Sequence, residues 1–153
     1  MRDRIRPPKD LEIVLDELKE LRLFQTKQKG MMFAAAMGYT INSKKDQHER
    51  PERYGEGIRL EYFQSPEDDG YINALAVAAH GTLEILADDR TDDRFDLFER
   101  YANTGLIELK RRLDSSRHVD RLEVILDILD DLGGDSQGDD SNDARVRRLA
   151  GLV

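Results

Sequence analysis

Five aspartates close together in the sequence come nearest to a catalytic arrangement. Asp88, Asp89, Asp92, Asp93 and Asp96 form the densest group of carboxylates in the chain. Carboxylate oxygens are ligands for divalent cations, so such a group could form a cation site like that of a nuclease. The lysine that would accompany it on an adjacent strand, in a Pro-Asp or Glu-x-Lys context, is missing. Aspartates are also stabilised at the start of a helix by the helix dipole. The pattern therefore favours a solvated acidic turn over a metal site.

Other kinds of catalytic site have no support in the sequence. The three histidines, His48, His80 and His118, lie in different predicted elements and form no recognised metal motif. The chain has no cysteine, which excludes disulfides, thiolate nucleophiles and thiolate metal sites. No Walker motif, G-x-G-x-x-G or G-x-S-x-G occurs. We therefore predict no catalytic residue, no metal ligand and no cofactor, and we expect that the protein is not an enzyme.

Basic residues in the first third of the chain are the remaining candidates for a functional site. They could follow a phosphate backbone if an N-terminal arm and the start of a helix converge. Acids such as Asp3, Asp46, Glu49 and Glu52 lie between them and weaken the pattern. The predicted nucleic-acid-binding residues are Arg2, Arg4, Arg6, Lys9, Lys27, Lys29, Lys44 and Lys45, and Arg50 and Arg53 extend the set.

The charge is distributed unevenly between the two parts of the chain. The 153 residues carry a formal net charge of -8. Residues 1–65 hold 13 Lys and Arg against 11 Asp and Glu, whereas residues 66–153 hold 11 against 21. An acidic second part repels nucleic acid at long range. Any DNA contact is therefore expected from the first part, and the second part would face water or a basic partner.

The first two elements that must position these residues are predicted to be helices. Pro7 and Pro8 end the basic arm, and a helix follows over residues 10–23. Its apolar residues have the three-and-four spacing of one buried face: Leu11, Val14, Leu15, Leu18 and Leu21. Thr26 predicts the N-cap of a second helix over 27–37, which Gly38 would end. Lys27 and Lys29 fall in its first turn, where an anion nearby would offset the unfavourable helix dipole.

The later part of the chain is also predicted to be mainly helical. Helices are expected over residues 71–80, from Thr91 onward, and over 118–132. The helix that begins at Thr91 is expected to be broken or kinked at residues 103–105. The last helix is expected to bury four residues, Leu122, Ile125, Leu126 and Leu129.

One segment has the alternating pattern of a strand. Residues 58–62 alternate apolar and charged side chains after a polar loop over 40–51. A single short strand needs a partner, and we expect residues 39–41 or the same strand of a second subunit. The predicted fold class is mainly α, a compact multi-helix domain with one short β-hairpin or strand pair at about Tyr39 to Tyr62.

The end of the chain is expected to lie outside the folded domain, which we place at residues 1–132. Residues 133–143 contain no hydrophobic residue and are predicted to form a flexible acidic linker. Residues 144–153 form a short basic amphipathic peptide with Arg145, Arg147 and Arg148. Disorder is expected for this tail of residues 133–153, and the basic peptide could dock on a partner or on the acidic surface of its own domain.

A set of short motifs, in order, resembles a known family. They are Arg2 to Asp10 before a Leu-rich acidic helix, Phe24-x-Thr26, the run from Phe33 to Tyr39, Gly57-Ile58-Arg59, and Glu99-x-Tyr101-Ala102-Asn103-x-Gly105-Leu106. This combination resembles the DNA phosphorothioation-associated protein 4 family, also called Dnd system-associated protein 4, over about residues 2–132. The resemblance implies a component of a system that replaces a phosphate oxygen of DNA by sulfur and restricts unmodified DNA. It carries no catalytic motif over to this chain.

The resemblance and the residues together lead to one favoured hypothesis and two alternatives. The favoured one is a non-catalytic accessory protein of a phosphorothioation-linked restriction-modification and antiphage defence system, either an adaptor or a DNA-binding subunit. The first alternative is a protein-interaction component that holds or masks a basic DNA-handling partner. The less favoured second alternative is a metal-dependent DNA nickase at Asp88 to Asp96.

Partners and location follow from the same hypotheses. We expect as partners the other proteins of a phosphorothioation or restriction locus, duplex DNA, and a second copy of the chain in a homodimer. No apolar run approaches the roughly 20 residues that span a bilayer. We therefore expect no membrane contact and a cytoplasmic location.

Overall fold

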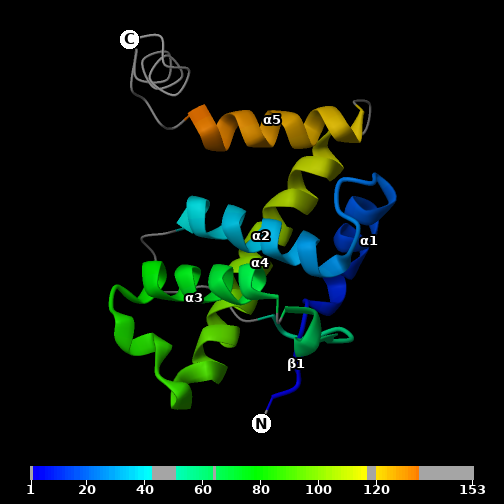
Figure 1. Ribbon diagram of the computed structural model, residues 1–153. Coiled ribbons are helices and arrows are strands. Elements are labelled where there is room, and N and C mark those ends of the chain that lie inside the picture. The colour runs from blue at the N-terminus through cyan, green and yellow to red at the C-terminus, as the bar shows by residue number, and fades with distance from the viewer. Residues whose placement is uncertain (1, 43–50, 64, 117–119, 135–153) are drawn as a thin grey trace, which may run out of the picture.

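Over the residues that the structure describes, the protein is mainly helical, with one pair of very short strands (Figure 1). The computed structural model describes residues 2–42, 51–63, 65–116 and 120–134. The elements are β1 (Arg4–Ile5), the 3₁₀-helix η1 (Lys9–Leu11), α1 (Glu12–Glu20), α2 (Lys27–Asn42), β2 (Ile58–Arg59), the 3₁₀-helix η2 (Leu60–Phe63), α3 (Pro66–His80), the 3₁₀-helices η3 (Leu83–Leu86) and η4 (Asp88–Arg90), α4 (Thr91–Ser115) and α5 (Arg121–Gly134). The predicted fold class is confirmed.

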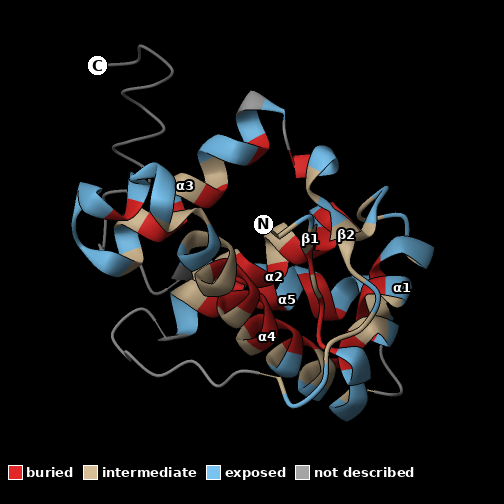
Figure 2. Cartoon of the chain, turned by 90° about the horizontal axis from the view of Figure 1, so that it is seen from below, coloured by how far each residue is buried: buried red, intermediate tan, exposed pale blue. Residues whose placement is uncertain are grey.

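The core lies where α2 crosses α4. These two helices make the most extensive contact between elements, and Figure 2 shows the buried residues gathered around their crossing. The backbones approach so closely that a Cβ atom added at Gly105 would overlap the carbonyl oxygen of Ala34, and one at Gly38 would overlap that of Tyr101. Small residues are therefore required on both helices at this point.

The other helices cover this crossing. Figure 1 shows α5 on one side of α2, α3 on the other, and α1 beside the start of α2. The apolar face predicted for the first helix is buried at Leu11, Val14, Leu15 and Leu18. Leu21 follows the helix as its C-cap and is half-buried.

Several predicted helix limits were wrong. The first predicted helix, over residues 10–23, ends earlier, at Glu20. The second helix continues past Gly38 to Asn42, because Gly38 serves the close approach to Tyr101 and does not end the helix. Residues 103–105 do not interrupt α4, since Gly105 provides the matching gap against Ala34. The third predicted helix begins earlier, at Pro66, where Ser65 caps it by accepting a hydrogen bond from the Asp68 amide.

The strand pair is confirmed, but its predicted partner was wrong. β2 is antiparallel to β1, with Arg4 opposite Arg59 and Ile5 opposite Ile58. Residues 39–41 cannot pair with it because they belong to α2, and beyond Arg59 the chain turns into η2. The N-terminal arm is therefore part of the folded domain, and the Ile5 side chain is 0% exposed.

The last helix also differs from its prediction. It buries Val124, Ile125 and Ile128, whereas Leu122, Leu126 and Leu129 are exposed. Its acidic side and its leucines both meet water because α5 packs along one narrow side against the end of α4. Gly133 and Gly134, expected to open the flexible linker, instead belong to this helix.

Some predictions fall on residues that the structure does not describe. The acidic linker from residue 135 and the basic peptide over 144–153 lie outside the described residues, as do Lys44, Lys45 and most of the loop over 40–51. Among the described residues, no helix is long and apolar enough to cross a membrane.

Candidate functional site

The N-terminal arm is held by one buried carboxylate on α4. Arg2 donates a hydrogen bond from Nη2 to Glu99 Oε2 at 2.6 Å, and the Arg6 backbone N–H donates to Glu99 Oε1 at 2.7 Å. The Glu99 side chain is 0% exposed. Burial raises the pKa of this carboxyl, an effect that the Arg6 amide and the two arginine charges only partly offset. The arm is thus fixed by a charge that is costly to bury.

The remaining arginines of the arm also contact the protein itself. The Arg6 guanidinium lies 4.0 Å from the centre of the Tyr54 ring, a cation–π contact. Arg4 donates from Nη1 to the Gly57 carbonyl at 2.8 Å. Lys9 is exposed, while its backbone N–H donates to the Arg53 carbonyl. These residues attach the arm to the segment over 53–60.

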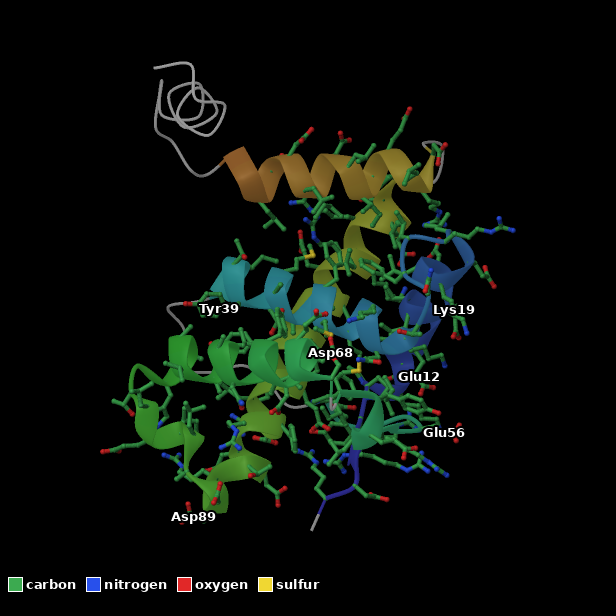
Figure 3. All side chains as sticks on the ribbon, viewed as in Figure 1. Glu12, Lys19, Tyr39, Glu56, Asp68 and Asp89 are labelled. Atoms are coloured by element: carbon green, nitrogen blue, oxygen red, sulfur yellow. The ribbon has the colours of Figure 1, made fainter. Side chains whose placement is uncertain are left out.

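The two lysines at the start of α2 are paired with carboxylates of neighbouring helices. Lys27 Nζ lies 3.2 Å from Asp16 Oδ1 on α1, and Lys29 Nζ lies 2.7 Å from Asp68 Oδ1 on α3. Gln28 donates a second hydrogen bond to Asp68, which is buried. Figure 3 shows Asp68 at the start of α3, next to α2. The expected anion near these cations is therefore supplied by the protein itself.

Asp68 is ionised more readily than an ordinary aspartate. Its burial raises the pKa, but hydrogen bonds from Lys29, Ser65 and Gln28 and the charge of Lys29 outweigh this effect, so the pKa lies below its usual range. The Asp68 backbone N–H donates in turn to the Ser65 hydroxyl at 3.2 Å. Asp68 therefore joins the starts of α2 and α3.

The predicted nucleic-acid-binding residues do not form one common cluster. Arg2 and Arg6 converge on Glu99, whereas Lys27 and Lys29 pair with separate carboxylates on two other helices. Lys44 and Lys45 lie outside the described residues. Direct DNA binding by these residues stays a prediction.

A pocket of about 510 Å³ lies next to the arm. Its apolar lining comes from Leu60, Phe63 and Phe95, and Phe63 packs edge-to-face on Phe98 with ring centres 5.9 Å apart. The polar residues that line it are Arg2, Asp69, Asp88, Asp89, Thr91 and Asp92. The pocket thus combines an apolar wall with four carboxylates, and we call it the acidic pocket.

Two of these four carboxylates, Asp69 and Asp92, lie at the starts of α3 and α4, and Asp88 and Asp89 lie in η4 just before α4. α3 carries Glu67, Asp68 and Asp69 in its first turn. α4 carries Asp92 and Asp93 in its first turn, directly after η4. Acids are favoured at these positions because they interact with the positive end of the helix dipole. Folding brings both helix starts to the same pocket, although they are more than 20 residues apart in the sequence.

The five aspartates singled out in the sequence divide into two groups. Asp88, Asp89 and Asp92 line the acidic pocket. Asp93 lies 3.0 Å from Arg90 Nε, and Asp96 lies 3.0 Å from Arg100 Nη2, so these two are in ion pairs. Within the described ranges, no group of three or more histidine or carboxylate side chains could hold a metal ion.

The acidic pocket has the chemistry to receive a basic side chain. The stems of arginine and lysine pack on apolar surface while their charged ends reach carboxylates. Here an aromatic and aliphatic wall lies within the same cavity as four acids. A segment of another protein that bears arginine or lysine would satisfy both parts.

Sequence reasoning missed two of the residues that matter most. Glu99 was overlooked as a buried acid, although it lies between Phe98 and the buried pair Tyr101 and Ala102. That position on an apolar helix face was the available signal. Asp69 was left outside the helix predicted over residues 71–80, because the start of α3 was placed five residues too late.

Comparison with known protein families identifies the family of the chain. The family model described as DNA sulphur modification system-associated protein 4 matches residues 4–147. No curated protein and no solved structure matched the chain significantly. The matched range covers the arm from Arg4, the four carboxylates and the apolar wall of the acidic pocket, and the helices that the structure describes. The chain therefore belongs to the family of DNA sulphur modification system-associated protein 4.

Proposed function

We propose that the protein is a non-catalytic adaptor of a DNA sulphur modification system, and that it holds a basic segment of another protein of that system. The observation that carries the proposal is the acidic pocket, where Asp69, Asp88, Asp89 and Asp92 share a cavity with three apolar side chains. Family membership supplies the setting, because the family is named for its association with such a system.

The use of the cations supports a protein partner over DNA. Arg2, Arg6, Lys27 and Lys29 are engaged by carboxylates of the same chain. Binding to a phosphate backbone would have to compete with these internal ion pairs. The acidic pocket, by contrast, attracts positive charge and needs no rearrangement of the arm. DNA would then be approached through the partner.

The arrangement of the acids supports binding over metal-dependent cleavage. Asp93 and Asp96 each contact an arginine. The other three aspartates of that group share their cavity with Leu60, Phe63 and Phe95. An apolar wall beside carboxylates suits the stem and head of a basic side chain.

The test measures binding of the purified chain to each of the other proteins encoded with it. Changing Asp88→Asn and Asp92→Asn removes two charges of the acidic pocket. We expect the affinity for one partner to fall roughly tenfold, or about 1.4 kcal/mol. Raising the salt concentration should weaken the wild-type complex more than that of the double variant, since fewer charges remain to be screened.

A matched control removes the same charge elsewhere. Glu20→Gln and Glu56→Gln change two exposed carboxylates, and Figure 3 places Glu56 on the opposite side of the molecule from Asp89. This variant should bind the partner as the wild type does. Two results would reject the pocket as the docking site. One is an equal loss of affinity in the pocket variant and in the control, and the other is an unchanged affinity of every partner for the pocket variant.

The two alternatives have their own measurements. Salt-dependent binding of the isolated chain to duplex DNA that weakens in an Arg4→Ala, Arg6→Ala and Lys27→Ala variant would favour the DNA-binding subunit. Metal-dependent nicking of DNA that Asp92→Ala and Asp93→Ala abolish would favour an enzyme. Under the proposed function, neither activity belongs to the isolated chain.

A further inference from the structure

One side of α5 carries a row of leucines that no other described residue covers. Leu122, Leu126 and Leu129 have the spacing i, i+4 and i+7, so they lie along one side of the helix. Their residues are 42%, 52% and 46% exposed. A surface helix normally has one buried apolar side and a polar outward side. A second, exposed apolar row such as this one is therefore unusual. We call these three residues the leucine row.

Carboxylates border the leucine row on one side. Glu123, Asp127 and Asp130 are exposed, and none forms an ion pair with another described residue. Asp131, at the far side of this group, accepts a hydrogen bond from Arg112 Nη1 at 2.6 Å. The surface therefore offers apolar side chains next to three carboxylates outside the ion pairs of the described residues. Asp127 and Asp130 share a groove with Arg111 and Arg112, which are paired with Glu108 and Asp131. Its occupant should be apolar on one side and basic on the other.

The sequence that follows α5 has this composition. Residues 144–153 contain Val146, Leu149 and Val153 at the spacing i, i+3 and i+7, together with three arginines, Arg145, Arg147 and Arg148. Between them and α5 lie residues 135–143, which have no hydrophobic side chain. The segment thus matches the leucine row in its apolar residues and the three carboxylates in its charge.

The length of the connection permits this contact. Nine residues span at most about 30 Å when extended. α5 has 14 residues, which corresponds to about 21 Å at the rise of an α-helix. The segment can therefore return along the whole of α5 from the point where that helix ends. Because both parts belong to one chain, docking would not require a high protein concentration.

A second copy of α5 is a poorer occupant. Leucine rows of two copies could meet, but their neighbouring carboxylates would then be brought close to each other. Like charges in such a contact repel and lower its affinity. The arginine-bearing segment replaces this repulsion by attraction.

We infer that residues 144–153 dock on the leucine row of α5 in the same molecule, with their arginines against Glu123, Asp127 and Asp130. The docked segment would cover the exposed leucines of the domain to which it belongs. This contact is separate from the acidic pocket, which lies at the starts of α3 and α4.

The test uses a nitroxide spin label on the full chain. The absence of cysteine allows one label at Ser115→Cys, an exposed position that lines the same groove as Asp127 and Asp130. NMR then records how strongly the label broadens the backbone amide signals of residues 144–153. A label at Glu84→Cys on η3, which Figure 1 shows far from α5, serves as the distant control.

Charge reversal distinguishes docking from mere proximity. We expect strong broadening from the label at position 115 and its loss when Arg145, Arg147 and Arg148 are changed to Glu, a variant that leaves the described domain untouched. Leu126→Asp should cause a similar loss. The variant with glutamate at positions 145, 147 and 148 can then be combined with Glu123→Lys, Asp127→Lys and Asp130→Lys. This combination should restore the broadening, because the charges of the segment and of α5 are again opposite.

Two results would overturn the inference. Equal broadening in the wild type and the glutamate variant would mean that the segment is tethered near α5 without docking. A mixture of isotope-labelled protein without nitroxide and unlabelled protein with nitroxide reports contacts between molecules. If the broadening in this mixture is as strong as within one molecule, residues 144–153 dock on the leucine row of a second copy and not on their own.

Discussion

At the scale of single residues, several charged side chains join elements of the fold to each other. Glu99 receives the arm, Asp68 receives Lys29 and Gln28, and Asp16 receives Lys27. Arg2, Lys27 and Lys29, which look available in the sequence, are thus engaged once the chain has folded. This explains how a run of cations can belong to a protein whose cavity is acidic.

The ion pairs of Glu108 predict a measurable dependence of the stability of the protein on pH. Hydrogen bonds from Arg111 and then Arg112 lower its pKa from 4.5 to about 2, against the opposing effect of burial. Between these values the native state binds fewer protons than the unfolded state, so stability rises with pH. The contribution of Glu108 is therefore fully present above about pH 4.5 and is lost as the pH falls toward 2.

The measurement compares the wild type with Glu108→Gln by urea unfolding between pH 2 and 6. The wild type should be the more stable of the two near pH 6, and the difference should shrink steadily as the pH falls through this window. A difference that stays constant with pH would show that Glu108 is not ionised in the way its arginine contacts require. Unfolding at low pH is expected in both proteins because Asp68 also has a lowered pKa.

At the scale of elements, the crossing of α2 and α4 depends on glycines inside helices. Gly38 and Gly105 each face a carbonyl oxygen of the other helix. Glycine is a poor helix former, so these positions lower the helix propensity of both segments. The close packing that they permit outweighs this cost.

Gly105→Ala should therefore destabilise the protein, although alanine is the better helix former. The added Cβ would overlap the Ala34 carbonyl, and we expect a loss of roughly 3 kcal/mol or more in the free energy of unfolding. The matched control is Gly70→Ala in α3, where nothing lies within 4 Å of the new atom. This control should gain about 0.5–1 kcal/mol. Chemical denaturation of both variants gives the comparison, and similar effects of the two changes would contradict the proposed packing.

At the scale of the whole molecule, the N-terminal arm connects parts that are distant in the sequence. Its backbone pairs with residues 53–60 and its side chains reach α4. Ile5 lies in the same buried cluster as residues of α1, α2 and α4. The arm is consequently a structural part of the domain.

Ile5→Ala should lower the stability of the entire domain, by about 2–5 kcal/mol, because it leaves a cavity in the core. Ile13→Ala, at a residue that is 66% exposed, should change it by less than about 0.5 kcal/mol. Thermal unfolding followed by circular dichroism would show one cooperative transition shifted in the first variant only. An unshifted transition for Ile5→Ala would mean that the arm is not needed for the fold.

Local patterns were sufficient to predict most of the elements. The three-and-four spacing of Leu11, Val14, Leu15 and Leu18 predicted the buried side of the first helix, and Thr26 predicted the start of α2, where its hydroxyl accepts a hydrogen bond from the Lys29 amide. Such features depend on residues within a few positions of one another. The C-terminal end of α2 and the continuity of α4 could not be predicted, because Gly38 and Gly105 act through a contact between two distant segments.

The sequence by itself determined a mainly helical protein with an acidic second part and the motifs that resemble its family. These properties follow from composition, periodicity and the order of short motifs. Only the tertiary structure decided that the arm pairs with residues 53–60, that Glu99 binds it, and that Asp69 shares a pocket with Asp88, Asp89 and Asp92. The physical reason is that ion pairs and pockets are formed by residues brought together from far apart in the chain, and local sequence patterns carry no information on which of them meet.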